Sequence, residues 1–523
     1  MELIFGIFQL FKYALILCFL YILKILYEFV YLPWRIRQRY SKYSNVLMTE
    51  KFYPMLGDLY LIDQNVKAKK AAFNHYFTEA IEHKDKDLRI VQFGADININ
   101  VLSVQAFEEF EKAVPKYIDR FHQTDLPAGN LSPGSLVTVK TDEKWKKKRK
   151  EIASAIGISQ CSKYIKMMLE TTDAQFNKVS ANQNIDFTLE IKEVTLSIII
   201  NVFFGHNIFD KLGDIRYINP FTGEVTHMGF VKLFIVLLAD ELVAWMSPKG
   251  KLFPFLQRWK LAEPYKTNKV NVDHLTGILR EYLETSDDKD SIYHELLKTG
   301  QFTKEECLMD CMNMMLAGFD TVAHFLTSIL HYLKKSPDKL DKLKKELDTI
   351  GLFDVENKSE QDLMQAYMEC DYLNFVMKEV LRIDTPVMQS SLYEVFESTE
   401  ICGVKLDKGQ LVGIDIVFCH YNPDQYHRPT EFLPERFDPE NELFFRPGGG
   451  KQARHPKSFI PFTFGARNCV GQTLARLESK VVLARLLEKI DYDLTEDIMN
   501  NPDAKFNAFE SMHLEGKILE SRY

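Results

Sequence analysis

Cysteine is scarce in this chain, since its 523 residues include only eight, and their spacing shows no disulfide framework. This excludes a disulfide scaffold and is typical of a protein whose bulk lies in a reducing compartment. Glycine and proline are not enriched, and hydrophobic residues make up 46% of the chain, which excludes a collagen-like or disordered protein. Acidic residues exceed basic ones, 73 against 65, and this acidic balance argues against nucleic acid as a partner.

The body of the chain shows no internal boundary. From about residue 60 onward there is no Gly/Ser linker, no internal repeat and no low-complexity tract. Apolar residues recur with helical spacing over much of this region. The clearest predicted helices cover residues 307–334, 371–383 and 472–487, and strand-like runs lie at 400–404 and 410–418. The pattern predicts one mainly α domain with a small β region over residues 60–523.

The N-terminus carries a long apolar run. Residues 3–32 are interrupted only by Gln9, Lys12, Lys24 and Glu28, and about 20 apolar residues suffice to span a bilayer. A cleaved signal peptide and an interfacial helix are the alternatives. The first is not supported by a small-residue cleavage site, and the second is not supported by a clean polar face. We therefore predict an uncleaved single-pass membrane anchor over residues 3–32.

Basic residues follow this run directly. Pro33 is followed by Arg35, Arg37, Arg39 and Lys42, whereas only Glu2 and the amino terminus precede the run. The positive-inside bias therefore places everything after the anchor in the cytosol. We interpret residues 33–59 as a basic linker or hinge between the anchor and the catalytic domain.

The strongest chemical signal is the segment FTFGARNCVG at residues 462–471. Cys469 precedes a predicted helix, and backbone N–H groups at a helix start lower a cysteine pKa and favour the thiolate. Gly465 lets the backbone approach a bulky planar ligand closely, and the forked guanidinium of Arg467 suits a carboxylate. An isolated cysteine is more often a buried structural residue, but the complete segment outweighs that interpretation.

This segment resembles the haem loop of the cytochrome P450 superfamily, F-x-x-G-x-R-x-C-x-G, at every fixed position from Phe462 to Gly471. Further family motifs occur in the family's order: Trp145 to Arg149 (W-x-x-x-R), Ala317 to Val322 (AGFDTV), Glu379 to Arg382 (E-x-x-R) and Pro434 to Phe437 (PERF). Together they cover roughly residues 50 to 495, and the anchored N-terminus matches the microsomal members. The resemblance implies the cytochrome P450 fold, preceded by one transmembrane helix.

The resemblance also implies roles for individual residues. Cys469 would be the axial ligand of the iron in haem b. Asp320 and Thr321 would deliver protons to dioxygen. The residues expected at the haem are Trp145, Arg149, Phe462, Gly465 and Arg467, and the expected buried structural trio is Glu379, Arg382 and Arg436. Considered alone, Glu379 and Arg382 could equally be a surface pair, and Thr321 could mark only a helix kink.

A run of lysines surrounds the W-x-x-x-R motif. Lys144, Lys146, Lys147, Lys148 and Lys150 are expected to point outward. They form either a solvated face or a docking surface for the acidic flavoprotein that supplies electrons in this family.

One departure from the family pattern concerns the haem carboxylates. After the E-x-x-R motif many relatives continue with a Pro-Pro pair and an arginine directed at a propionate. Residues 383–393 of this chain contain one proline and no arginine. Propionate binding is therefore expected to depend more on Trp145, Arg149 and Arg467.

These observations predict a haem-thiolate monooxygenase of the endoplasmic reticulum membrane, with its catalytic domain in the cytosol. It would insert one oxygen atom into a lipophilic organic substrate, with electrons from NADPH through a flavoprotein reductase and with cytochrome b5 as a further candidate partner. The substrate class stays open among fatty acids, sterols, terpenoids and xenobiotics. The alternatives are an isomerase or dehydratase that needs no reductase, and a haem sensor without turnover. The retained Asp320–Thr321 pair argues against both.

Overall fold

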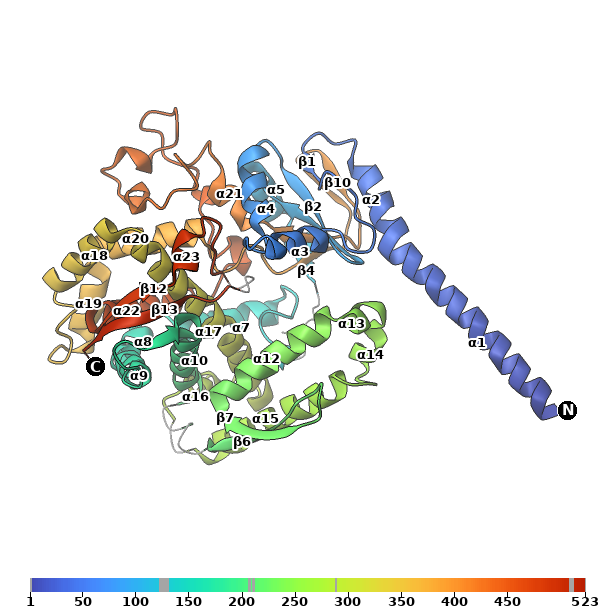
Figure 1. Cartoon of the computed structure of the whole chain (residues 1–523), viewed down its shortest axis with the longest axis horizontal. Coiled ribbons are helices and arrows are strands. Elements are labelled where there is room, and N and C mark those ends of the chain that lie inside the picture. The colour runs from blue at the N-terminus through green and yellow to red at the C-terminus, as the bar shows by residue number, and fades with distance from the viewer. Residues whose placement is uncertain are drawn as a thin grey trace.

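The computed structural model describes residues 2–121, 131–205, 208, 212–286, 289–507 and 512–522. Over these residues the chain forms a mainly helical body with small β-sheets, from which a long N-terminal helix projects (Figure 1). The predicted fold class, mainly α with a small β region behind one apolar N-terminal helix, is confirmed.

The described helices follow one another with few strands between them. They are α1 (Glu2–Leu26), α2 (Leu32–Tyr40), α3 (Leu59–Lys67), α4 (Asn74–Glu82), α5 (Val104–Ala113), α7 (Glu143–Ala155), α8 (Ile158–Cys161), α9 (Ile165–Phe176), α10 (Phe187–Phe204), α12 (Phe230–Met246), α13 (Pro248–Leu252), α14 (Pro254–Arg258), α15 (Tyr265–Thr285), α16 (Ile292–Lys298), α17 (Lys304–Lys334), α18 (Pro337–Thr349), α19 (Glu360–Glu369), α20 (Asp371–Ile383), α21 (Ile416–Tyr421), α22 (Gln472–Lys489) and α23 (Glu496–Asn500).

The strands are short. They are β1 (Val46–Leu47), β2 (Leu88–Phe93), β3 (Asp96–Val101), β4 (Ile118–Arg120), β5 (Asn184–Asp186), β6 (Asp214–Ile218), β7 (Val225–Gly229), β8 (Tyr393–Val395), β9 (Thr399–Ile401), β10 (Val404–Leu406), β11 (Leu411–Ile414), β12 (Ile490–Leu494) and β13 (Glu515–Ser521). The largest sheet has the order β1-β2-β3-β11-β8-β4, and a second has the order β12-β13-β5. Two hairpins, β6–β7 and β9–β10, complete the β structure of the described residues.

The long helix α17 runs through the main hydrophobic core, which it shares with α9, α10, α20 and α22. Its start is fixed by a capping box, in which the Thr303 side chain accepts the Glu306 N–H and the Glu306 carboxylate accepts the Thr303 N–H. The predicted helix over 307–334 therefore begins three residues earlier. The Met-rich stretch of α17 is buried in the same core.

The predicted strand over 410–418 is wrong in its second half. Strand β11 ends at Ile414, and residues Ile416–Tyr421 form the short helix α21, whose side chains are all buried. A short apolar run that is buried on every side has no period that separates helix from strand. The hairpin β6–β7 was not predicted, although its strands pair over five residues.

The N-terminal helix continues beyond residue 32, into the segment that the sequence predicts to be a basic linker or hinge. A π-helical turn at Tyr27–Tyr31 joins α1 to α2, which ends only at Tyr40. Pro33 has no N–H to donate, and the carbonyl of Phe29 accepts the Met55 N–H of the body instead, at 3.1 Å. Residues 33–40 are thus helical, and Pro33 and Tyr40 are buried.

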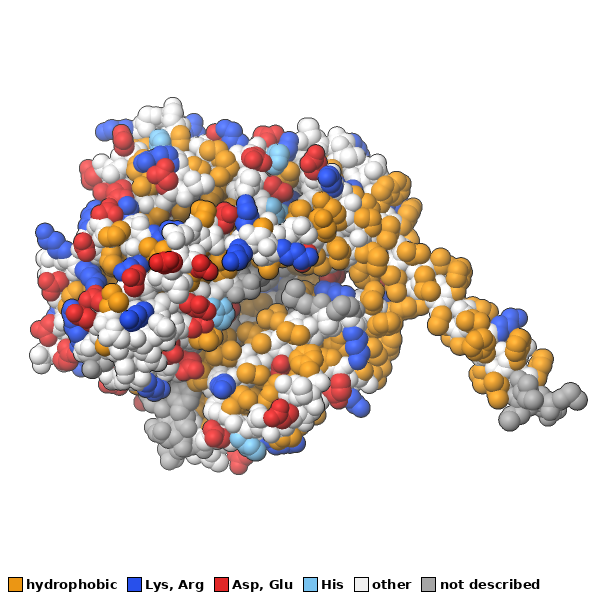
Figure 2. Space-filling model, in the orientation of Figure 1, with side chains coloured by type: hydrophobic (Ala, Val, Ile, Leu, Met, Phe, Trp, Pro, Cys, Tyr) orange, Lys and Arg blue, Asp and Glu red, His pale blue; other side chains and the backbone are white. Residues whose placement is uncertain are grey.

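Among the described residues one helix, spanning residues 7–40, is long and apolar enough to cross a membrane. Most of its apolar side chains between Ile7 and Leu26 are exposed (Figure 2). The helix touches the body from Tyr21 onward, where the Tyr21 ring stacks on Phe253 with centroids 5.4 Å apart. The helix therefore has both a free, apolar part and a part that packs on the catalytic body.

Candidate active site

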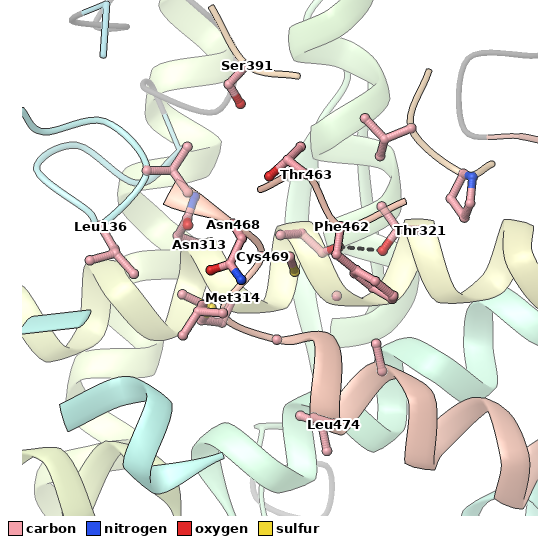
Figure 3. A pocket seen from close by; sticks show the side chains of 18 of the residues that line it. Leu136, Asn313, Met314, Thr321, Ser391, Phe462, Thr463, Asn468, Cys469 and Leu474 are labelled. Atoms are coloured by element: carbon pink, nitrogen blue, oxygen red, sulfur yellow. Dashed lines mark hydrogen bonds between the residues drawn. The ribbon is translucent and has the colours of Figure 1, made fainter. Parts of the chain in front are cut away.

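A cavity of about 320 Å³ lies inside the body, between α17, α7 and the loop that precedes α22. Its walls are mainly apolar and include Ile156, Ile199, Phe203, Val322, Phe325 and Leu474. Figure 3 shows Cys469 from the loop and Thr321 from α17 extending into the same hollow. Trp145, Arg149, Phe462 and Arg467 of the predicted site also line this cavity.

The loop before α22 is shaped to present Cys469. The Cys469 N–H donates to the Phe462 carbonyl at 2.9 Å, which closes the loop on itself. Gly465 has a φ of +70°, and a Cβ there would lie 3.1 Å from the Glu111 carboxylate. Both features favour glycine at this position. The side chain of Cys469 is consequently exposed to the cavity although it lies deep in the protein.

The free thiol of Cys469 does not have the lowered pKa that its place before a helix predicts. Burial raises the pKa of the thiol, and the N–H groups of Gly471 and Gln472 and the charge of Arg149 offset only part of this effect. In the unliganded side chain, burial therefore outweighs the effect of the helix start on the pKa. A metal ion at the sulfur would itself impose the thiolate form.

Trp145 and Arg467 are held together beside the cavity. Helix α7 begins at Asp142, whose carboxylate accepts the Trp145 N–H at 2.7 Å. The indole N–H of Trp145 donates to the Leu136 carbonyl at 3.1 Å, and the Arg467 guanidinium lies 3.9 Å from the indole centroid. Arg467 also donates to the Leu136 and Val139 carbonyls and to a hydroxyl. Burial lowers the pKa of Arg467 to about 10.

Arg149 reaches the loop of Cys469 from one turn further along α7. Its guanidinium donates to the side-chain oxygen of Asn468, the residue before Cys469. Burial lowers the pKa of Arg149, and the Cys469 sulfur counteracts this effect. The spacing of Trp145 and Arg149 by four residues therefore does place both on the cavity side of α7.

Arg120 is a cavity residue that the sequence analysis missed. It lies on β4, its guanidinium is 4.4 Å from the Tyr393 ring centroid, and it donates to the Ser391 carbonyl at 3.0 Å. Its Nε has no hydrogen-bond partner among the described residues. No motif marks this position. The only sequence signal was indirect: residues 383–393 lack the arginine that many relatives direct at a haem propionate, so a cation from elsewhere in the chain was needed for that carboxylate.

Asp320 and Thr321 are consecutive on α17, and the structure separates their side chains. Thr321 lines the cavity, where its hydroxyl donates to the Ala317 carbonyl at 2.8 Å (Figure 3). Asp320 does not line the cavity, and its carboxylate lies 2.9 Å from Lys192 Nζ and 3.5 Å from His324 Nε2. Burial would raise the pKa of Asp320, but His324 and Lys192 outweigh it and lower the pKa to about 2.

The predicted trio of Glu379, Arg382 and Arg436 is assembled outside the cavity. Arg382 donates to both Glu379 carboxylate oxygens at 2.8 Å, and Arg436 Nε donates to one of them at 3.0 Å. All three side chains are fully buried. Arg382 also donates to the His420 and Pro429 carbonyls. The trio thereby joins α20 to the segment that leads toward the Cys469 loop.

The lysine run on α7 is only partly exposed, although all five lysines were expected to point outward. Lys148 is buried against Asp310, whereas the other members, Lys144, Lys146, Lys147 and Lys150, are exposed. Lys144 and Lys146 form ion pairs with Glu306 and Glu143. The expectation that Lys148 points outward is therefore wrong, because its partner comes from a helix far away in the sequence.

The model of the family described as Cytochrome P450 matches residues 51–515. The chain belongs to the cytochrome P450 family. Cytochrome P450 4V2 of Rattus norvegicus is 27% identical to it over 369 residues, which cover 67% of this chain and 66% of that protein. Cytochrome P450 3A2 of Rattus norvegicus is 25% identical over 378 residues, covering 69% and 70%. Cytochrome P450 4V2 of Mus musculus is 24% identical over 479 residues, covering 86% and 85%.

Family membership makes the chain a monooxygenase of the oxidoreductase class, with haem b as cofactor. The cavity fits this group on its own chemistry. Its mainly apolar walls suit a macrocycle, and the Cys469 thiol is exposed to it as a ligand for iron. Arg120 and Arg149 at the same cavity are suitable partners for haem carboxylates, and the Arg120 Nε–H, which has no acceptor among the described residues, could donate to one.

Proposed function

We propose that this P450 inserts one oxygen atom of O2 into a lipophilic organic substrate at the endoplasmic reticulum membrane. Its electrons would come from NADPH through a membrane-bound flavoprotein reductase, with cytochrome b5 as a second donor protein. The observation that carries the proposal is the exposure of the Cys469 thiol to an apolar cavity that Thr321 also lines.

We assign the binding of the cofactor to residues of the cavity and its loop. When bound, haem b would supply an iron atom for chemistry on dioxygen, with a cysteine thiolate as a ligand. Cys469 is the proposed ligand, and Phe462 and Gly465 shape the loop that presents it. Trp145, Arg149 and Arg467 are the proposed partners of the haem carboxylates, to which we add Arg120. Glu379, Arg382 and Arg436 have the proposed role of a structural support for this loop.

We assign proton delivery to Thr321 and Asp320. The Thr321 hydroxyl now donates to the Ala317 carbonyl, and it would have to turn toward the cavity to donate a proton there. Asp320 is ionised at neutral pH and is held by Lys192. It would accept a proton from solvent and pass it toward the Thr321 Oγ after its contact with Lys192 loosens. A hydroxyl and a carboxylate in this order form a general acid–base relay.

The surface of the body supports the proposed membrane location. Apolar side chains of α12 and α14 and of the segment after them are exposed, among them Val243, Trp259 and Leu261. They belong to the part of the chain that contacts the projecting helix through Phe253, and Figure 2 shows hydrophobic side chains on the body where that helix leaves it. A lipophilic substrate dissolved in the bilayer would meet this face first.

The exposed lysines of α7 are the proposed docking site for the reductase. Lys144, Lys146, Lys147 and Lys150 lie on the outer face of the helix that also carries Trp145 and Arg149. A positive patch on an acidic protein steers an acidic partner. The same helix lines the cavity with Trp145 and Arg149.

The test is a difference spectrum of the reduced protein with carbon monoxide, followed by oxygen consumption in the presence of lipophilic compounds. The proposal predicts a thiolate-type spectrum and oxygen consumption that requires both NADPH and the reductase. Turnover without NADPH would favour the isomerase or dehydratase alternative. A normal spectrum without turnover of any compound that shifts the haem absorption would favour a sensor.

A further inference from the structure

Lys148 and Asp310 form an ion pair in the interior of the protein. Lys148 Nζ lies 2.6 Å from Asp310 Oδ2, and the two side chains are 4% and 2% exposed. Lys148 comes from α7 and Asp310 from the first turns of α17, so the pair joins the two helices. Removing two charges from water is costly unless further contacts compensate. The hydrogen bonds that compensate this cost therefore indicate which part of the structure the ion pair supports.

Both members of the pair also bind the backbone that precedes α7. The second carboxylate oxygen of Asp310 accepts the Leu136 N–H at 2.7 Å. Lys148 Nζ donates to the Gly134 carbonyl at 3.3 Å. The ion pair thus holds the segment 134–136 at two of its peptide groups.

The backbone of Leu136 continues this connection to the cavity wall, through the peptide group on the other side of its Cα. Its carbonyl accepts the indole N–H of Trp145 at 3.1 Å and the Arg467 Nη1–H at 3.2 Å. Arg467 also stacks on Trp145, 3.9 Å from the ring centroid. One residue, Leu136, is thus held by Asp310 through its N–H and sets the position of two cavity side chains through its carbonyl. Shifting Leu136 would move both.

We propose that the Lys148–Asp310 ion pair is a positioning device for haem binding, acting through Leu136 on Trp145 and Arg467. Neither Lys148 nor Asp310 is among the described residues that line the cavity, so neither touches the cofactor itself. The inference rests on the proposed function, in which Trp145 and Arg467 bind the haem carboxylates. It also separates Lys148 from the exposed lysines, whose proposed partner is the reductase.

The experiment uses the full-length holoprotein and measures the rate of haem transfer to an excess of apomyoglobin. Lys148→Met and Asp310→Asn are each expected to accelerate haem loss. Outer partners of a metal site typically contribute about 10- to 100-fold to affinity, and we expect an acceleration of that order. The midpoint potential of the haem, measured on the same samples, is expected to shift as well. The reason is that Trp145 and Arg467, the proposed partners of the haem carboxylates, move. Neither measurement needs the reductase.

Two further variants distinguish positioning from general stabilisation. Asp173→Asn breaks a comparable ion pair with the largely buried Arg485, 2.6 Å away between α9 and α22, which has no contact with Leu136. It should lower the melting temperature without accelerating haem loss. Lys148→Met/Asp310→Leu replaces the pair by apolar side chains, which often restores stability. Its melting temperature should recover while haem loss stays fast, because the Leu136 N–H still has no acceptor.

The inference is overturned if the double variant recovers its melting temperature and retains haem as the wild type does. It is equally overturned if the single variants lose haem no faster than Asp173→Asn. Trp145→Phe and Arg467→Leu distinguish a failure of the proposed haem contacts from a failure of the positioning role. If these two accelerate haem loss and Lys148→Met does not, the proposed haem contacts stand and only the positioning role is wrong. If none of them has an effect, the proposed contacts and the role built on them both fail.

Discussion

Asp320 and Lys192 form an ion pair between α17 and α10, with Oδ1 and Nζ 2.9 Å apart, beside the cavity rather than in it. The next residue, Thr321, points into the cavity. A proton relay through both residues therefore requires the Asp320 carboxylate to exchange Lys192 for water or for Thr321. In the structure the Asp320 carboxylate is bound to Lys192 outside the cavity. Its pKa of about 2 keeps it ionised at neutral pH.

Asp320→Asn is expected to slow product formation by about 10²- to 10⁴-fold, the usual contribution of a general acid–base group. The amide keeps the shape of the side chain but cannot take up and release the proton. Lys192→Met is the matched variant, because it breaks the same ion pair and keeps the carboxylate. It should stay much closer to the wild-type rate. Equal rates for Asp320→Asn and the wild type, at equal haem content, would exclude Asp320 from the relay.

Cys469→Ser is expected to abolish the spectrum that is typical of a thiolate ligand in the reduced carbon monoxide complex. A serine hydroxyl is a far weaker anionic ligand than a thiol, and the loop conformation does not depend on the sulfur, since the backbone N–H makes the closing bond. Cys402→Ser, at a partly exposed cysteine outside the cavity, is the control and should leave the spectrum unchanged. Persistence of the spectrum in Cys469→Ser would refute the assignment of the ligand.

Deleting residues 2–26 is expected to weaken membrane attachment and to leave the haem spectrum and the melting temperature nearly unchanged. Phe29 and Tyr40 stay in place in this variant, and both are buried in the body. Deleting residues 2–40 removes these two side chains and the Tyr40 hydroxyl bonds to Lys405 and Gln410. Losing buried aromatic side chains is costly, so the longer deletion should lower the melting temperature by several degrees. Equal melting temperatures would show that the helix is an anchor along its whole length.

A cluster of buried carboxylates around Arg89 predicts how stability changes with pH. Burial raises the pKa of Asp415 from about 3.8 to about 7, and the charge of Arg89 offsets only part of this. Between these two values the folded protein binds more protons than the unfolded chain, so the free energy of unfolding falls as the pH rises. Asp415→Asn removes the contribution of Asp415 to this dependence, whereas Asp58 and Glu79, whose pKa values burial also raises, keep theirs. The melting temperature of Asp415→Asn should change less than that of the wild type between pH 5 and 7.5, and an equal change would contradict the assignment.

Local sequence was sufficient for one helix in full and for the loop of Cys469. The predicted helix over 371–383 agrees with α20 in both bounds, because its apolar spacing and the proline after it act within a few residues. The Cys469 loop likewise depends on its own glycines and backbone bonds. These features need no knowledge of distant partners.

What could not be predicted depends on contacts between distant parts of the chain. Lys148 looks like a surface lysine until Asp310, 162 residues later, lies beside it. Arg120 enters the cavity because β4 pairs with β8. The orientation of Asp320 follows from Lys192 on another helix. A long charged side chain is predicted to be exposed unless an oppositely charged partner is known, and here each partner lies far away in the sequence.

Thr321→Ala is expected to uncouple the enzyme rather than silence it. The substitution removes a hydroxyl that lines the cavity and leaves Cys469, the carboxylate partners of haem and the docking surface intact. Electrons from NADPH should still be consumed at a comparable rate. Ordered proton delivery should fail, so that product per NADPH falls and hydrogen peroxide rises in proportion. Product, peroxide and NADPH have to be measured together, with a substrate that shifts the haem absorption.

Thr327→Ala is the matched control for this experiment. Thr327 lies on the same helix and donates to the Ala323 carbonyl at 2.8 Å, the same bond at the same length that Thr321 makes to Ala317. It is buried and does not line the cavity. Both variants lose one hydroxyl, one methyl group and one helix hydrogen bond, so any effect on helix packing should appear in both. Uncoupling in Thr321→Ala alone would identify its hydroxyl as a proton donor in the cavity, whereas equal coupling in both variants would make Thr321 a packing residue.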